Sequence, residues 1–197
     1  MFLVDDLGDT TIELEDEGYD IVRADIGWTL GDNIEALQLQ GSADIDGVGN
    51  ALANNIQGNS GANRLEGGAG ADTINGNDGD DIIVGGVTGD HLRGGAGADT
   101  FVVAHAFGPT LETDIIYDFD TGQGDTIDLS AIDTNLSLDG DQGFVLVGSF
   151  TKAAGQMTLT YAAGQTTLRL DLNGDGRVDY QMKINGDVTH DSGGWAL

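Results

Sequence analysis

Residues 49–102 read GNALANNIQ, GNSGANRLE, GGAGADTIN, GNDGDDIIV, GGVTGDHLR and GGAGADTFV, which are six consecutive units of nine residues. Every unit begins with glycine, carries Asn or Asp at position six and places an apolar residue at position eight. Repetition at such a short fixed period is typical of a solenoid, in which each unit packs only on its neighbours. We therefore predict an all-β fold: a parallel β-roll solenoid of nonapeptide repeats.

Position six places a short side chain that carries oxygen at the end of each six-residue loop. Hard cations bind such side chains together with loop carbonyls. The position-six residues are Asn54, Asn63, Asp72, Asp81, Asp90 and Asp99. Glycine at position one allows the tight loop and the close backbone approach that this binding needs. The remaining candidate ligands in the repeats are Gly67, Gly76, Gly85, Gly94 and, at position three of the fourth unit, Asp78.

Position eight supplies the core of the predicted roll. Only one residue in nine is firmly buried by this pattern, so two units should wind into one coil and six units should give three coils. Loops would then stack every second unit, which predicts ions between Asp72 and Asp90 on one edge and between Asp81 and Asp99 on the other. Asn54 and Asn63 lie one coil earlier and are neutral, so their sites should be weaker or empty.

Residues 1–48 and 103–197 flank the repeats and are predicted to cap them. The first segment has strand-like stretches at 11–14, 20–24 and 36–40, and these predict degenerate coils that shield the N-terminal end of the roll. In the second segment, 114–120 and 124–130 should form a strand, a turn and a strand, and Asp114 and Asp125 could close the last ion site. Strands at 144–147, 157–161, 167–172 and 178–184 should form a small C-terminal sheet.

The stretch DLNGDGRVD, residues 171–179, has the spacing of the front of an EF-hand loop. Its candidate ligands are Asp171, Asn173, Asp175 and Asp179. Met182 stands where the bidentate Glu of that loop would be, and the flanks are strand-like. A cation site without that ligand and a plain Asn-Gly-Asp-Gly hairpin turn both fit the residues, and we favour the cation narrowly.

The charge balance favours cations over other partners. There are 34 acidic and 7 basic residues, a net charge of −27, so we predict no binding to nucleic acid or to anionic membranes. Adaptation to high salt would explain acidity, but not Asp at every ninth residue. No cysteine is present, so disulfides and thiolate metal sites are excluded. No apolar run approaches the roughly 20 residues of a membrane span.

Catalysis within this chain is not expected. The only histidines, His91, His105 and His190, form no H-E-x-x-H motif, and no G-x-S-x-G motif is present. The chain also has no signal-peptide pattern at its start, so we expect either another export route or, by preference, a piece of a longer protein.

The repeats at 49–102 resemble the RTX (repeats-in-toxin) β-roll. Residues 94–130 are similar to the C-terminal region of serralysin-type metalloproteases and to the R-modules of mannuronan C5-epimerases. The resemblance implies several bound calcium ions, held by the position-six carboxylates and loop carbonyls, with Asn54, Asn63 and Thr88 as departures. It also implies a secreted, extracellular location reached by type I export from a Gram-negative bacterium, with folding only after export.

Two functions follow as expectations. The first is a module that folds on calcium outside the cell and supports the secretion and stability of a larger protein, whose catalytic or effector domain lies elsewhere. The second is a calcium-dependent carbohydrate-binding or adhesin module. It would recognise a polysaccharide on the outward polar face formed by Asn55, Gln57, Asn75, His91 and Arg93, although the two tryptophans lie far from that face in sequence.

Overall fold

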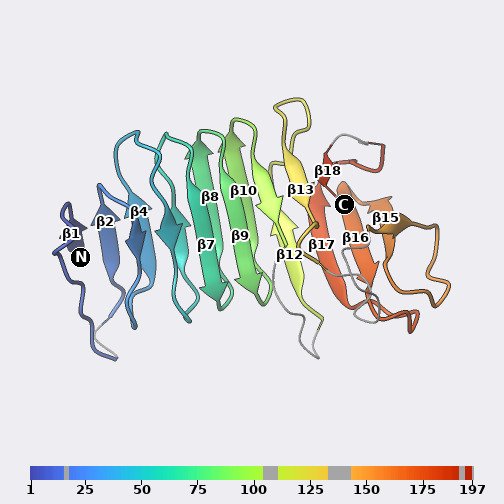
Figure 1. Cartoon of the computed structure of the whole chain (residues 1–197), viewed down its shortest axis with the longest axis horizontal. Coiled ribbons are helices and arrows are strands. Elements are labelled where there is room, and N and C mark those ends of the chain that lie inside the picture. The colour runs from blue at the N-terminus through green and yellow to red at the C-terminus, as the bar shows by residue number, and fades with distance from the viewer. Residues whose placement is uncertain (16–17, 104–110, 133–142, 191–193, 197) are drawn as a thin grey trace.

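The described part of the chain consists of strands, turns and irregular segments and contains no helix. A computed structural model describes residues 1–15, 18–103, 111–132, 143–190 and 194–196. The strands lie side by side along the long axis of the molecule, and from β1 to β13 they follow the order of the chain (Figure 1). The predicted all-β class and the parallel roll are confirmed.

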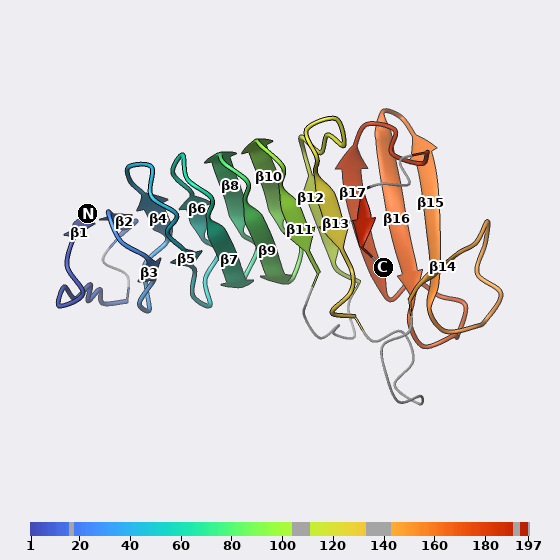
Figure 2. The same ribbon diagram turned by 45° about the horizontal axis from the view of Figure 1, so that its top comes forward.

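Two sheets form the two walls of the roll, which Figure 2 shows as separate layers. The 11-stranded sheet runs in the order β1 (Phe2–Val4), β2 (Ile21–Ala24), β4 (Ala36–Leu39), β6 (Asn55–Gln57), β8 (Thr73–Asp78), β10 (His91–Ala96), β12 (Thr113–Ile116), β17 (Tyr180–Asn185), β16 (Gln165–Asp171), β15 (Gln156–Ala162) and β14 (Val145–Leu146). The 7-stranded sheet runs in the order β18 (Trp195–Ala196), β13 (Thr126–Asp128), β11 (Thr100–Val102), β9 (Ile82–Val87), β7 (Arg64–Ala69), β5 (Gly47–Val48) and β3 (Trp28–Thr29).

Two nonapeptide units make one coil, as the repeat predicts. His91 of β10 pairs in parallel with Thr73 of β8, and Ile82 of β9 pairs with Arg64 of β7. Equivalent loop residues therefore stack 18 positions apart. Successive units thus alternate between the two sheets, and all their loops fall on two edges of the roll.

The position-eight side chains fill the space between the sheets. All six are at most 2% exposed: Ile56, Leu65, Ile74, Ile83, Leu92 and Phe101. They belong to one continuous hydrophobic cluster that also includes buried residues from both flanking segments. Because each coil adds only two large core side chains, the repeats bury little apolar surface for their length.

The N-terminal segment continues both sheets as coils of irregular length. Hydrogen bonds join Arg23 to Gln38 over 15 residues and Gln38 to Gln57 over 19, where the repeats use 18. The predicted strands at 20–24 and 36–40 are present as β2 and β4, but the one predicted at 11–14 is wrong. Ile12 and Leu14 are 77% and 63% exposed there, because that segment pairs with no neighbouring strand.

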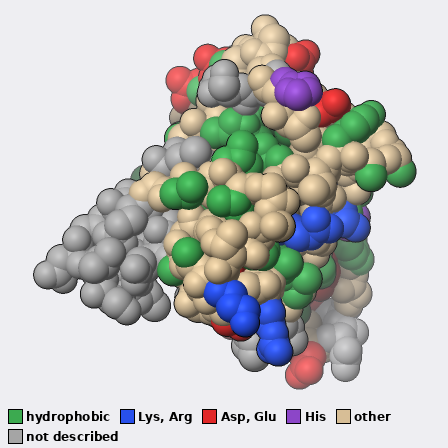
Figure 3. All heavy atoms as spheres, turned by 90° about the vertical axis from the view of Figure 1, so that its right-hand side faces the viewer, with side chains coloured by type: hydrophobic (Ala, Val, Ile, Leu, Met, Phe, Trp, Pro, Cys, Tyr) green, Lys and Arg blue, Asp and Glu red, His purple; other side chains and the backbone are tan. Residues whose placement is uncertain are grey.

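The C-terminal segment extends both sheets instead of forming a separate one: β13 and β18 continue the 7-stranded sheet, and the other strands join the 11-stranded sheet. β17 pairs in parallel with β12, after which β16 and β15 continue as antiparallel neighbours. This end carries four of the seven basic residues, Lys152, Arg169, Arg177 and Lys183. Lys and Arg side chains accordingly appear together with hydrophobic ones on the end face of the molecule (Figure 3). The three-part division at residues 48 and 102 stays a prediction.

Candidate metal centre

A column of position-six side chains runs along each edge of the roll. The first ladder consists of Asn54, Asp72, Asp90 and Asp114, and the second of Asn63, Asp81, Asp99 and Asp125. In the first ladder each backbone N–H donates to the Oδ1 atom of the next member, at 2.7, 2.9 and 3.0 Å in turn. The second ladder repeats this with 2.8, 3.0 and 3.0 Å.

The predicted pairing of position-six residues is therefore present in the structure. Asp72 contacts Asp90, and Asp81 contacts Asp99, through the ladder hydrogen bonds. Asp114 and Asp125 follow as the next members, as their sequence context suggested. Within residues 49–102 the ladder arises because every nine-residue unit places its Asn or Asp at the same point of the loop, whereas Asp114 and Asp125 follow at spacings of 24 and 26 residues.

Four carboxylate oxygens in these ladders have no hydrogen-bond partner among the described residues. They are the Oδ2 atoms of Asp72, Asp81, Asp90 and Asp99. All four side chains are at most 1% exposed. A buried carboxylate oxygen without a donor is costly, so these atoms mark a place where a positive charge belongs.

Each of the four oxygens lies against the position-one glycine of its own unit. A Cβ atom built on Gly67 would collide with Asp72 Oδ2 and with the carbonyl oxygen of Gly85, one coil further on. Gly76 stands in the same relation to Asp81 Oδ2 and to the carbonyl of Gly94. Position one has no positive φ in any unit, so backbone conformation does not require glycine there. Glycine is needed because carboxylate and carbonyl oxygens approach its Cα too closely for a side chain.

The donor set fits a hard divalent cation. Calcium takes oxygen ligands from carboxylates and backbone carbonyls in flexible geometry. Within the described residues no group of three or more His, Cys, Asp or Glu side chains could hold a metal. The ligands would therefore be one or two ladder carboxylates together with loop carbonyls, of which the position-one glycines of the last four units supply candidates.

Burial raises the pKa of the ladder carboxyls. It raises that of Asp72 to about 7 and that of Asp90 to about 8, with backbone N–H donors opposing the shift. The pKa values of Asp81 and Asp99 rise to about 6 for the same reason. Neighbouring carboxyls raise the pKa values of Asp81, Asp90 and Asp99 further. Without a bound cation, the ladder carboxyls therefore resist ionisation.

Protein donors terminate each ladder at its C-terminal end. The Tyr180 hydroxyl donates to Asp114 Oδ2 at 2.5 Å, and the backbone N–H of Asp120 donates to Asp125 Oδ2 at 2.8 Å. Burial raises the pKa of Tyr180 well above its usual range, so it stays a donor. Sequence reasoning missed Tyr180, which is 66 residues from Asp114 and stands in no recognisable motif.

The predicted loop at 171–179 connects β16 to β17 as a hairpin. Asp171 is fully buried and accepts hydrogen bonds from the backbone N–H groups of Gly174 and Gly176. Asp179 accepts from the backbone N–H groups of Leu172 and Asn173. Asp175 accepts from Arg177 N. Backbone N–H groups of the turn thus donate to its own carboxylates, and a cation at this turn stays a prediction. Asp78, at the end of β8, is exposed.

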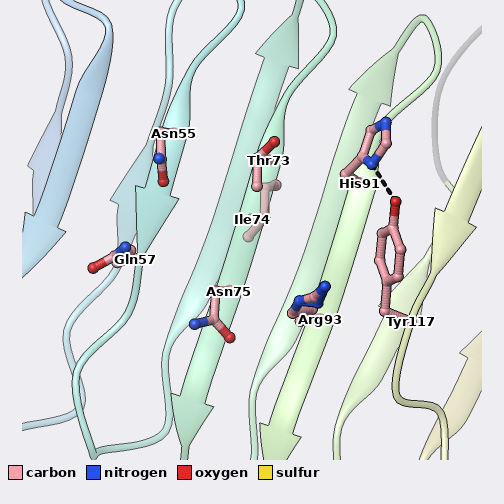
Figure 4. A pocket seen from close by; sticks show the side chains of 8 residues that line it. All are labelled: Asn55, Gln57, Thr73, Ile74, Asn75, His91, Arg93 and Tyr117. Atoms are coloured by element: carbon pink, nitrogen blue, oxygen red, sulfur yellow. Dashed lines mark hydrogen bonds between the residues drawn. The ribbon is translucent and has the colours of Figure 1, made fainter.

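The outward face of the first sheet contains a cavity of about 280 Å³. Its lining comprises Asn55, Gln57, Thr73, Ile74, Asn75, His91, Arg93 and Tyr117, shown in Figure 4. His91 Nδ1 lies 2.5 Å from the Tyr117 hydroxyl, and the Arg93 guanidinium lies 4.3 Å from the centre of the Tyr117 ring. The polar face predicted from sequence therefore exists, with an aromatic ring that sequence reasoning did not place there.

The fold and its buried ladders define an RTX-type β-roll. The family described as Peptidase M10 serralysin C terminal matches residues 43–193, and the chain belongs to this family. Family and structural neighbours together indicate an RTX-like calcium-binding module. No curated protein sequence matches the chain. Where the structure describes the chain, it contains no helix long and apolar enough to cross a membrane.

Solved structures that resemble the chain include two subunits of the mannuronan C5-epimerase AlgE6 from Azotobacter vinelandii. The R2 subunit is 25% identical with a TM-score of 0.56, and the match covers 75% of this chain and 87% of that one. The R3 subunit is 30% identical with a TM-score of 0.48, over 71% of this chain and 74% of that one.

Proposed function

We propose that the chain is a non-catalytic module that folds when calcium fills its two ladders and that supports the export and stability of a larger secreted protein. The observation that carries this proposal is the set of four buried Oδ2 atoms without a donor. A bound cation would offset these charges when the carboxyls are ionised, since no donor among the described residues reaches the four oxygens. Binding free energy at such a site is then folding free energy.

The proposed mechanism links folding to the compartment. At the low calcium concentration inside a cell, the stacked carboxylates repel one another, and the small core does not offset the loss of chain entropy. The chain would stay unfolded and suitable for threading through a type I exporter. At millimolar calcium outside the cell, sites of even modest affinity fill, and the roll forms.

The direct test compares Asp→Asn variants in calcium titrations followed by circular dichroism. Asp72→Asn and Asp90→Asn remove one charge from the first ladder, whereas Asp25→Asn makes the same change on an exposed residue. The ladder variants should need at least about tenfold more calcium to reach half of the signal, which corresponds to ~1.4 kcal/mol. Equal midpoints for ladder variants and control would contradict the proposal.

Export has a separate test. The full chain would be produced in a bacterial strain that carries a type I exporter, and its amount in the medium would be compared with that in the same strain lacking the exporter. Exporter-dependent appearance of the chain in the medium supports this part of the proposal. Equal amounts in both strains would refute the export role without affecting calcium-driven folding.

A second candidate function is polysaccharide binding at the outward cavity. The observation that favours it is Tyr117, because aromatic rings and planar guanidinium and amide groups are what a sugar-binding surface needs. Mannuronan oligosaccharides are a suitable first probe, since the R2 neighbour is a subunit of a mannuronan C5-epimerase. In a titration with calcium present, Arg93→Ala should abolish binding, whereas Arg23→Ala, on β2 of the same sheet, should not. Unchanged binding by Arg93→Ala would exclude this cavity.

A further inference from the structure

The loops of the first two units differ from the later four in backbone conformation. In the last four units, position two has a positive φ, at Gly68 (101°), Asn77 (81°), Gly86 (109°) and Gly95 (108°). No residue between 49 and 66 has a positive φ. The peptide group before position two therefore points in a different direction in the two kinds of loop.

This difference decides whether the position-six oxygen has a donor. In the first unit the backbone N–H of Asn50 donates to Asn54 Oδ1 at 2.7 Å. In the second unit the N–H of Asn59 donates to Asn63 Oδ1 at 2.9 Å. The four Oδ2 atoms without a donor all belong to loops with positive φ at position two. In the first two loops a backbone N–H therefore donates to the position-six side-chain oxygen. In the later loops the equivalent oxygen, Asp Oδ2, has no such donor.

Side-chain amides also satisfy the carbonyls of the preceding coil. Asn50 Nδ2 donates to the carbonyls of Gly31 and Ile34, at 2.7 and 2.8 Å. Asn54 Nδ2 also donates to Ile34, at 3.0 Å. The Asn50 amide nitrogen thus bridges two carbonyl oxygens between stacked loops, as a bound cation would.

The second edge repeats the arrangement with a different pair. Asn59 Nδ2 donates to the carbonyls of Gln40 and Ala43, at 3.0 and 2.9 Å. Asn63 Nδ2 donates to the carbonyl of Ile45 at 2.7 Å. Asn54, Asn59 and Asn63 are at most 7% exposed, so these amides are part of the interior.

We propose that the amides of Asn50, Asn54, Asn59 and Asn63 take the place of the cation in the first two loops, so that the cation ladder begins only at Gly67. This inference rests on the proposed calcium function and specifies where that function starts. The coils that precede Gly67 are joined by hydrogen bonds that calcium neither strengthens nor competes with. Calcium stabilises the coils from Gly67 to Asp125.

The first test restores the later pattern in the first loop. Isothermal titration would count the calcium ions bound by the natural chain, by Asn50→Gly/Asn54→Asp and by the control Asn55→Asp, which adds a carboxylate on the outer face. The double variant should bind one more ion than the natural chain, and the control should bind none in addition. An unchanged count for the folded double variant would overturn the proposal.

The second test holds even if the double variant does not fold. Thermal unfolding of Asn54→Ala would be followed at saturating calcium and at tenfold higher calcium, beside Asn55→Ala. The Asn54→Ala midpoint should fall by several degrees relative to the natural chain and by the same amount at both concentrations. Recovery of the midpoint at higher calcium would show that a cation binds in this loop and would overturn the proposal.

These tests separate the inference from the proposed function. If the natural chain binds no calcium and unfolds identically in EDTA, the proposed function fails, and the inference that rests on it fails with it. If the natural chain binds calcium but Asn54→Ala responds to calcium as Asp72→Ala does, only the inference fails.

Discussion

Tyr180 donates its hydroxyl to Oδ2 of Asp114 and so joins the C-terminal strand β17 to the last member of the first ladder. The hydroxyl occupies the position at which the Oδ2 atoms of Asp72 and Asp90 have no donor among the described residues. The contact therefore ends the column of buried carboxylates with a neutral protein group, and it makes the C-terminal segment part of the same structure.

Tyr180→Phe removes this donor and leaves the ring in place. We expect the free energy of unfolding in calcium to fall by ~1–3 kcal/mol, because a buried carboxylate loses a hydrogen bond. Chemical denaturation followed by tryptophan fluorescence measures the change. Tyr161→Phe is the matched control, since Tyr161 is 49% exposed and should change little. Similar losses for both variants would argue against the capping role.

Asp81→Ala and Asp99→Ala should each raise the calcium concentration at half-folding by about tenfold or more, since each removes a ladder carboxylate. Asn63→Ala should shift this calcium midpoint little, because Asn63 uses its amide to bind protein carbonyls. Calcium titration by circular dichroism gives all three midpoints. Equal shifts for the three variants would refute the pairing of Asp81 with Asp99 as the cation site.

Thr88 occupies position four of its loop with a φ of 85°, where Gly70, Gly79 and Gly97 have the same left-handed sign in the other late units. A β-branched residue in that region is strained by ~1–3 kcal/mol. Thr88→Gly should therefore stabilise the calcium-bound roll by about 1 kcal/mol after the added chain entropy is subtracted. Val87→Gly, one residue earlier and without positive φ, should destabilise it. The denaturation midpoint of each variant in calcium measures the change. A lower midpoint for Thr88→Gly than for the natural chain would contradict the strain at Thr88.

The raised pKa values predict opposite pH dependences with and without calcium. In the unfolded chain these carboxyls have a pKa near 3.8, and in the cation-free roll about 6 to 8. The folded state then binds more protons, so in EDTA the folded fraction should be largest near pH 4 and should fall as pH rises toward 8, where the cation-free chain is unfolded. Calcium binds ionised carboxylates, so the calcium concentration at half-folding should fall as pH rises over the same range.

Asp90→Asn tests the origin of this effect, since the pKa of Asp90 is raised most, to about 8. The variant should weaken the pH dependence of the folded fraction in EDTA, because one raised carboxyl pKa is removed. Circular dichroism at a series of pH values measures this. A pH profile identical to that of the natural chain would show that the ladder carboxyls are not responsible.

The repeat itself made most of the roll predictable. A period of nine with one buried residue per unit leaves few ways to build a core, so the two-unit coil and the pairs Asp72–Asp90 and Asp81–Asp99 followed from spacing alone. The segment at 11–14 alternates polar and apolar residues like a strand, but pairing depends on neighbours that a local pattern does not contain. β1 and Tyr180 were missed for the same reason.

The conformation of position two shows where sequence reasoning ends. Asn50, Asn59 and Asn77 are the same residue type at the same position, yet only Asn77 has a positive φ. Asn tolerates both conformations, and here the positive φ accompanies Asp at position six while the other conformation accompanies Asn. The site is thus fixed by contacts between coils, which the unit sequence alone does not describe.

The most direct measurement is far-UV circular dichroism of the 197-residue chain in EDTA, titrated with calcium and in parallel with magnesium. We predict a cooperative gain of β-structure with calcium, and none with magnesium at the same concentration, because magnesium demands a more rigid, strictly octahedral site. A full β-spectrum in EDTA that calcium leaves unchanged would contradict it.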